Sequence, residues 1–205
     1  TSLGFIDRFL ITAEAYQVPA IVVFNKTDVY KEKDFNNLAL IKSIYEPLGY
    51  PVLPMSIEKN DGVEVVKATL KNKVTLLSGH SGVGKSSFIN AIFPEFQIRT
   101  QDVSGWSGKG MHTTTFAEMH DLPFGGSIID TPGIRELGLV DISKNELAHF
   151  FPEMRSLMQA CQFNNCMHIN EPGCAIKEAV EAGIIHPERY YSYLNILETI
   201  EKKSY

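Results

Sequence analysis

Residues 79–86 read Gly79-His80-Ser81-Gly82-Val83-Gly84-Lys85-Ser86, and they follow the apolar run 74–77. The segment fits the pattern G-x-x-x-x-G-K-[ST], which lies between a strand and a helix in proteins that bind nucleoside triphosphates. Its glycines let the backbone curl so that N–H groups point at phosphate oxygens. We expect Lys85 to bridge the β- and γ-phosphates and Ser86 to ligate Mg²⁺. The segment therefore predicts a phosphate-binding loop, with a glycine-rich turn as the alternative.

Patterns typical of helices and strands alternate around this loop. Helical periodicity is found in four segments, residues 3–16, 35–45, 63–70 and 85–92. Short apolar runs typical of buried strands lie at residues 20–24, 52–55 and 74–77, and two further strands at 116–122 and 126–129 are spaced as a hairpin. Strands that alternate with helices predict an α/β fold with a mostly parallel sheet covered by helices on both faces.

A second motif, Asp130-Thr131-Pro132-Gly133, follows the strand predicted at 126–129. Asp130 would lie at the carboxyl end of a strand, where open α/β sheets bind ligands, and it would hold Mg²⁺ through water. Gly133 lacks a Cβ, so its N–H can approach a γ-phosphate. Alone this motif is a common turn. Beside a phosphate loop it predicts the second metal-binding element of a nucleoside triphosphatase.

A third motif, Asn25-Lys26-Thr27-Asp28, ends the strand predicted at 20–24. The carboxylate of Asp28 can accept hydrogen bonds from guanine N1–H and its 2-amino group, two donors that adenine does not present together. Lys26 can lie along the base, and Asn25 can tie this turn to the phosphate loop. The motif therefore predicts GTP as the nucleotide; a capped turn is the alternative.

Ser56 follows the strand predicted at 52–55, where its backbone would contact the guanine O6. This segment carries no weight by itself. If the Asn25 motif were accidental, the same phosphate loop would instead suit an ATP-dependent kinase, and a competition between GTP and ATP separates the two.

All three cysteines lie within 14 residues of one another, with a histidine among them. The spacing Cys161-x4-Cys166-x-His168-x5-Cys174 supplies the ligand set of a closed tetrahedral zinc site, which leaves no position for a catalytic water. We expect one structural Zn²⁺; free cysteines beside an incidental histidine are the alternative. An odd, clustered cysteine count also favours a reducing compartment, so we expect the chain to be cytoplasmic.

Composition narrows the class of protein. The 205 residues are 44% hydrophobic and 21% charged, which is typical of folded globular chains. A net charge of −5 argues against a protein that coats nucleic acid through bulk electrostatics, although a local contact with RNA remains open. Apolar runs are far shorter than the ~20 residues that a membrane-spanning helix needs, so we expect no membrane partner.

The order of the motifs is unusual. Small GTPases carry the phosphate loop first and the Asn-Lys-x-Asp motif near the end, whereas here Asn25–Asp28 and Ser56 come first. We therefore predict a circularly permuted P-loop GTPase fold over residues 1–140 and a small, mainly helical zinc-binding domain over residues 141–205. Permutation is physically permissible where the original termini lie close together at the surface.

With its permuted motifs and its Cys/His cluster, essentially the whole chain resembles the ribosome small subunit-dependent GTPase A family, RsgA or YjeQ. The resemblance implies a GTP hydrolase that acts as a switch in late maturation of the small (30S) ribosomal subunit. It implies contact with that subunit and its rRNA, and we expect a monomer. In this family a nucleic-acid-binding barrel of the OB type precedes the GTPase domain, so we expect this chain to be a fragment without it.

The resemblance also assigns roles to residues. It marks Thr114, or its neighbour Thr113, as the switch threonine that reaches Mg²⁺, and it suggests that His112 places the attacking water, so the expected catalytic residues are His112, Lys85 and Thr114. Ile134 stands where many GTPases carry a glutamine that orients water, so hydrolysis by the chain alone should be slow and stimulated by the small subunit. The alternative is a GTP-dependent ribosome-binding scaffold with negligible turnover.

The residues expected to bind GTP or GDP are Asn25, Lys26, Asp28, Ser56, Gly79, Ser81, Gly82, Val83, Gly84, Lys85, Ser86, Ser87, Thr113, Thr114, Asp130 and Gly133. The expected Mg²⁺ ligands are Ser86, Thr114 and, through water, Asp130. The expected zinc ligands are Cys161, Cys166, His168 and Cys174.

Overall fold

The computed structural model describes residues 2–96, 118–130 and 142–203. Contacts divide the chain into two compact units that do not follow chain order. The sheet unit comprises Val23–Leu40 and Val52–Glu136, and the helical unit comprises Thr1–Val22, Ile41–Pro51 and Leu137–Tyr205. The helical unit thus combines the C-terminal residues with the first helix and with the end of the second, a grouping that the sequence did not indicate.

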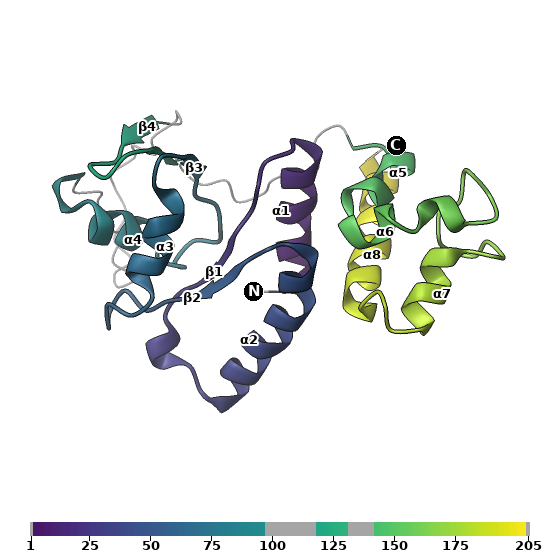
Figure 1. Ribbon diagram of the computed structural model, residues 1–205, viewed down its shortest axis with the longest axis horizontal. Coiled ribbons are helices and arrows are strands. Elements are labelled where there is room, and N and C mark those ends of the chain that lie inside the picture. Colours follow the sequence, from purple (N-terminus) through teal and green to yellow (C-terminus); the bar gives the residue numbers. More distant parts are fainter. Residues whose placement is uncertain (1, 97–117, 131–141, 204–205) are drawn as a thin grey trace. The chain divides into compact units, whose positions relative to one another are not determined.

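The strands and helices from β1 to β5 alternate as predicted (Figure 1). They are β1 (Val22–Phe24), α2 (Glu32–Tyr45), β2 (Val52–Pro54), α3 (Val63–Leu70), β3 (Val74–Leu76), α4 (Lys85–Ile92), β4 (Glu118–Asp121) and β5 (Ser127–Asp130). Each described strand is three or four residues long. Strand β1 begins two residues later than predicted, and β2 and β3 each end one residue earlier.

The described strands form two small sheets, β1–β2 and β3–β5–β4. Strand β3 runs parallel to β5, and Leu76 lies opposite Ile129. Strand β4 runs antiparallel to β5 through a tight turn, in which the Leu122 N–H donates to the Gly126 carbonyl at 2.8 Å, so the predicted hairpin is confirmed. The parallel pair places the carboxyl ends of β3 and β5 at one edge of the sheet.

The core of the sheet unit lies between its helices and its strands. Its buried apolar side chains come from α3, α4, β5 and the segments that follow β2 and β4, and they are Met55, Val63, Val66, Leu70, Phe88, Ile89, Ile92, Leu122 and Ile128. Helix α3 packs against α4 through the apolar positions predicted from its periodicity. This packing fixes the first turn of α4, which carries the end of the phosphate loop.

The helical unit is built from short helices around α8. Its elements are α1 (Leu3–Ala15), α5 (Lys144–Leu147), α6 (Pro152–Arg155), α7 (Ala175–Glu181) and α8 (Pro187–Lys203). Helix α8, yellow in Figure 1, packs against α1 and α5. The core joins Ile11 of α1 to residues such as Phe151, Ile176 and Tyr193. Among the described helices, none is both long enough and apolar enough to cross a bilayer.

Arg189 lies at the centre of a buried charge cluster in the helical unit. The side chain is 1% exposed, and its guanidinium donates to Asp7 Oδ1 at 2.5 Å and to the two Glu153 carboxylate oxygens at 2.6 and 3.1 Å. It also lies 4.7 Å from the centre of the Phe151 ring. Tyr45 at the end of α2 donates its hydroxyl to Asp7 at 2.6 Å. The cluster therefore ties α8 to α1, α6 and the end of α2.

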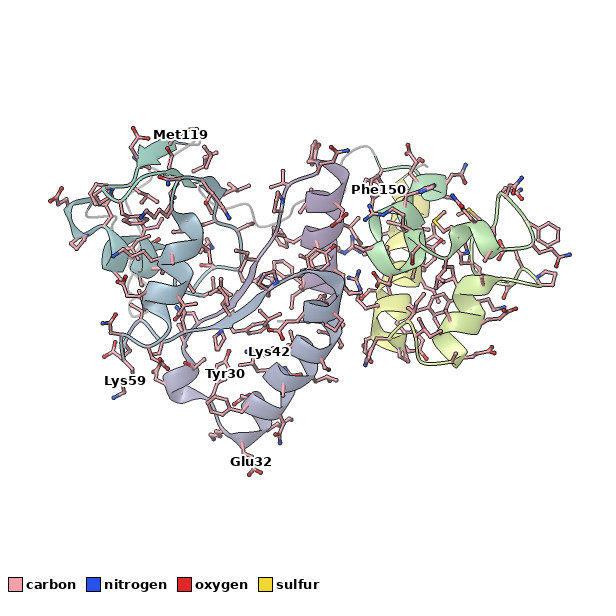
Figure 2. The ribbon with its side chains drawn as sticks, in the orientation of Figure 1. Tyr30, Glu32, Lys42, Lys59, Met119 and Phe150 are labelled. Atoms are coloured by element: carbon pink, nitrogen blue, oxygen red, sulfur yellow. The ribbon has the colours of Figure 1, made fainter. Side chains whose placement is uncertain are left out.

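A shallow hollow of about 410 Å³ lies elsewhere in the helical unit, lined by the end of α1 and by His149, Phe150 and Arg155. Phe150, one of the residues that line the hollow, is labelled in Figure 2. Arg155 donates to Glu14 at 3.3 Å across the hollow, and its side chain remains 54% exposed. This exposed ion pair contrasts with the buried pairs of Arg189.

Candidate nucleotide site and metal centre

The predicted phosphate loop leaves β3 and enters α4 through Gly84, whose φ of +98° lies in the left-handed region that glycine adopts without strain. The Lys85 ammonium donates to the carbonyl oxygens of Gly79 and His80 at 2.7 and 2.9 Å. These bonds hold the charged group over the turn of the loop. The loop itself is largely accessible to solvent, with Ser81 and Gly82 exposed.

Asn25 and Lys26 lie against this loop although they are almost sixty residues away in sequence. The Asn25 side-chain amide donates to the Val83 carbonyl at 3.0 Å, and its oxygen accepts from the Lys26 N–H at 2.8 Å. The Lys26 ammonium donates to the Gly82 carbonyl at 2.8 Å. The structure thus brings the Asn25 motif and the phosphate loop into one site.

Asp28 and Ser56 meet at the other side of the Asn25 turn. The Ser56 hydroxyl donates to Asp28 Oδ1 at 2.5 Å and accepts from the Lys59 N–H at 3.1 Å, and Ser56 is 1% exposed. The serine therefore fixes the direction of the Asp28 carboxylate. No sequence pattern predicts this side-chain contact, because it depends on the ends of β1 and β2 lying side by side.

Asp130 ends β5, immediately after the residue that pairs with Leu76 of β3. Ser86 begins the neighbouring helix after the loop that follows β3. Because β3 and β5 are parallel, the chain passes through these two residues at the same edge of the sheet. Serine and aspartate are residue types that supply the hydroxyl and carboxylate oxygens that Mg²⁺ prefers.

Four of the predicted site residues, His112, Thr113, Thr114 and Gly133, lie outside the described residues. The phosphate loop and the Asn25 turn lie within the described residues. The contacts above join the phosphate loop, the Asn25 turn and Ser56.

The predicted zinc ligands converge at the start of α7. Their ligand atoms, from Cys161, Cys166, His168 and Cys174, all lie within 4.8 Å of one another. His168 Nδ1 lies 3.4 Å from Cys174 Sγ and 3.7 Å from Cys161 Sγ. Bond lengths of about 2.0 Å to nitrogen and 2.3 Å to sulfur place tetrahedral zinc ligands about 3.5–3.8 Å apart. The donor set and its spacing therefore fit zinc, with four protein ligands.

Burial shifts the pKa of two of these ligands, Cys166 and His168. It raises the pKa of the Cys166 thiol to about 12, with a smaller rise from the neighbouring Cys174 and Cys161 thiols, while a backbone hydrogen bond acts the other way. It also lowers the pKa of His168, which favours the neutral imidazole that a metal requires. A thiol must lose its proton to bind a metal, so metal binding here releases protons.

Glu171 is a polar residue of this region that the sequence analysis missed. It accepts hydrogen bonds from backbone N–H groups of the segment that carries His168. Partial burial opposes ionisation, but these N–H groups outweigh it and lower the pKa of Glu171. In the sequence, Glu171 is marked only by its place between two predicted zinc ligands, three residues after His168 and three before Cys174. Many exposed glutamates lie in such places.

Comparisons with known proteins agree with this geometry. The family model described as RsgA GTPase matches residues 1–140. The small ribosomal subunit biogenesis GTPase RsgA 2 of Bacteroides thetaiotaomicron is 48% identical over 205 residues, which cover 100% of this chain and 66% of the relative. The chain spans less than two-thirds of the length of this and the other curated relatives, from 61% to 66%.

Two solved structures share the fold. The crystal structure of YjeQ from Thermotoga maritima superposes with a TM-score of 0.83 and 38% identity, over 98% of this chain and 66% of that chain. YloQ, described as a circularly permuted GTPase, superposes with a TM-score of 0.78 and 31% identity, over 99% of this chain and 64% of that chain. The permuted fold predicted from the order of the motifs is confirmed, and the chain belongs to the RsgA GTPase family.

Proposed function

We propose that this chain binds GTP with Mg²⁺, hydrolyses it to GDP and phosphate, and acts as a switch in maturation of the small ribosomal subunit. The observation that carries the proposal is the set of hydrogen bonds that joins Asn25 and Lys26 to the phosphate loop and Ser56 to Asp28. These bonds bring a base-recognising carboxylate and a phosphate-binding loop into one site. The names of the relatives, which are small ribosomal subunit biogenesis GTPases, support the role in subunit biogenesis.

Each group has a role in holding the nucleotide. Backbone N–H groups of the loop, from Ser81 to Ser87, bind the phosphates together with the Lys85 ammonium. Asp28 accepts from the guanine edge, and Lys26 covers the base. Ser86 and, through water, Asp130 hold Mg²⁺, which when bound neutralises charge on the β- and γ-phosphates. Transfer of the γ-phosphoryl group to water then depends on positioning, since the protein forms no covalent bond with the nucleotide.

Hydrolysis needs a group that positions water. We assign this role to His112, and we assign Thr113 or Thr114 to the γ-phosphate and Mg²⁺, with Gly133 donating its N–H to the γ-phosphate. Ile134 carries no hydrogen-bonding side chain and cannot orient water. Turnover by the chain alone should therefore be slow, and the small subunit should supply the missing positioning.

The Cys/His cluster completes the proposal. One structural Zn²⁺ on Cys161, Cys166, His168 and Cys174 would hold the segment before α7, which has few apolar residues of its own. We further propose that the chain is a cytoplasmic monomer that contacts rRNA, with residues 1–140 as the GTPase domain and residues 141–205 as the zinc domain.

Turnover with and without small ribosomal subunits tests the enzyme assignment. We expect the chain to release phosphate from GTP slowly by itself and at least tenfold faster with purified small subunits, because bound subunits would help to position the attacking water. Phosphate release is measured in separate reactions with small subunits and with large subunits, and the large subunits serve as the control. Tight GTP binding with no stimulated turnover would favour the scaffold instead.

Replacing Asp28 by asparagine tests the base contact. We expect GTP affinity to fall about 10- to 100-fold, since a bidentate contact to a base contributes about 1–3 kcal/mol. Affinity for xanthosine triphosphate should rise, because the asparagine amide can donate to the xanthine 2-oxygen. Competition against a fluorescent GDP analogue measures both, and ATP is the control ligand. Equal affinity of the unmodified chain for GTP and ATP would contradict the assignment and favour the kinase.

A further inference from the structure

The segment that carries His168 adopts an unusual backbone conformation. His168 has a φ of +60°, in the left-handed region that residues other than glycine rarely occupy. Its Nδ1 faces the sulfur atoms of Cys161 and Cys174. Something other than local preference must therefore hold this residue in the conformation that aims Nδ1 at the metal position.

The usual orienting contact is missing at the ring itself. A metal-binding histidine commonly donates its second ring N–H to a carboxylate or carbonyl, and that contact fixes the ring. Here His168 Nε2 is buried and has no hydrogen-bond partner among the described residues. The orientation of the ring then depends on the backbone that carries it and on packing against the Tyr193 ring, whose centre lies 6.2 Å away.

Glu171 holds that backbone from the N–H side. Its Oε1 accepts from the Met167 N–H at 2.8 Å, and its Oε2 accepts from the Ile169 and Asn170 N–H groups at 2.9 and 3.0 Å. One carboxylate thus binds the N–H groups on both sides of His168. Three such bonds to an ionised group are stronger than bonds between neutral partners.

Two tyrosines of α8 hold the same segment from the carbonyl side. The Tyr190 hydroxyl donates to the His168 carbonyl at 2.6 Å, and the Tyr193 hydroxyl donates to the Met167 carbonyl at 2.8 Å. Side chains of residues outside the segment 167–170 therefore bind both its N–H groups and its C=O groups. These bonds, rather than regular secondary structure, hold the shape of the segment.

We propose that Glu171 is a positioning residue of the zinc site, which fixes the backbone around His168 so that its Nδ1 meets the metal. The inference rests on the zinc assignment proposed above. Glutamine at this position keeps one acceptor oxygen but replaces the other with an amide that donates. At least one backbone N–H would then face a donor, and the segment would lose its single shape.

Zinc binding by the Glu171→Gln variant of the full chain tests this role. We expect zinc affinity, measured by competition with a chromogenic chelator, to fall about 10- to 100-fold. The visible absorption bands of bound Co²⁺ should broaden, because His168 would sample several orientations. Glu171→Asp keeps both oxygens on a shorter side chain and should recover part of the affinity. Glu181→Gln removes an exposed carboxylate from the same region and should match the unmodified chain.

The outcomes separate this inference from the zinc assignment. If the unmodified chain binds no zinc, the assignment itself fails. If it binds one zinc and Glu171→Gln binds within threefold of that affinity with unchanged Co²⁺ bands, the positioning role is wrong. Should Glu171→Gln not fold, Glu171→Asp tests the same carboxylate, because its shorter side chain loosens the bonds to the Met167, Ile169 and Asn170 N–H groups. Zinc affinity and Co²⁺ bands of Glu171→Asp equal to those of the unmodified chain overturn the proposal as well.

Discussion

Replacing Arg189 by methionine is expected to lower the free energy of unfolding by about 3–5 kcal/mol. The substitution leaves Asp7 and Glu153 buried without their counter-ion, and their side chains are 0% and 8% exposed. It also removes the guanidinium from the Phe151 ring. Removing one partner of a buried ion pair costs far more than the pair contributes, because the remaining charges stay out of water. Denaturant unfolding followed by circular dichroism measures the loss.

Arg155→Met is the matched control, since it removes the same charge from an exposed pair. Arg155 is 54% exposed where it meets Glu14, and such pairs contribute about 0–1 kcal/mol. The Arg189 variant should therefore be the less stable by several kcal/mol. Equal stability of the two variants would contradict the cost expected for leaving Asp7 and Glu153 buried without their counter-ion.

A second substitution separates lost packing from unpaired charge. Adding Asp7→Asn to Arg189→Met removes one of the stranded carboxylates, so the double variant should be more stable than Arg189→Met alone. The two substitutions share an interaction and should not be additive. If the losses in free energy of unfolding of the two single variants simply add in the double variant, lost packing of the apolar part of Arg189 accounts for most of the destabilisation.

The Arg189 cluster also shows what sequence patterns leave out. The helical periodicity of residues 3–16 predicted α1 almost to its ends, and Pro187 occupies the first position of α8, where proline is common. Nothing local indicated that these two helices pack together, because Asp7 and Arg189 are 182 positions apart. A lone arginine in an amphipathic helix is normally exposed, so its burial depends on partners that only the folded chain supplies.

The candidate site was easier to predict where its residues are close in sequence. The phosphate loop and the cysteine cluster follow from spacing, because each fits a fixed ligand geometry within a few residues. The bond from Asn25 to Val83 was expected from the motif, and the structure contains it. The Ser56 hydroxyl and the Glu171 carboxylate were not predicted, since hydrogen bonds from serine and glutamate leave no spacing pattern.

Replacing Gly84 by alanine is expected to weaken binding of GTP and GDP about 30- to 1,000-fold. The φ of +98° at Gly84 is strained for any residue with a side chain, at a cost of about 1–3 kcal/mol. The added Cβ would also lie 2.3 Å from Asn25 Nδ2, so the amide must leave the Val83 carbonyl and lose a bond of about 1 kcal/mol. Together these costs are about 2–4 kcal/mol, and each 1.4 kcal/mol is tenfold in affinity.

Gly82→Ala is the matched control in the same loop. Gly82 also has a positive φ, of +78°, but an added Cβ there meets nothing within 4 Å. It should pay the backbone strain without the collision, so its loss of affinity should be smaller. Titration with a fluorescent GDP analogue measures both variants, and thermal unfolding without nucleotide checks that both remain folded. Binding by Gly84→Ala within threefold of the unmodified chain would refute the prediction.

Asn25→Ala identifies the source of the difference. Once the Asn25 amide is gone, the nearest remaining atom to the Cβ of Gly84→Ala is Ile57 Cδ1 at 3.7 Å, an ordinary contact. Gly84→Ala should then cost less in the Asn25→Ala background than in the unmodified chain, and the difference between the two costs is the coupling between the turn and the loop. If Gly84→Ala lowers nucleotide affinity equally in both backgrounds, backbone strain alone weakens the site. The collision with the Asn25 amide would then contribute nothing to the loss.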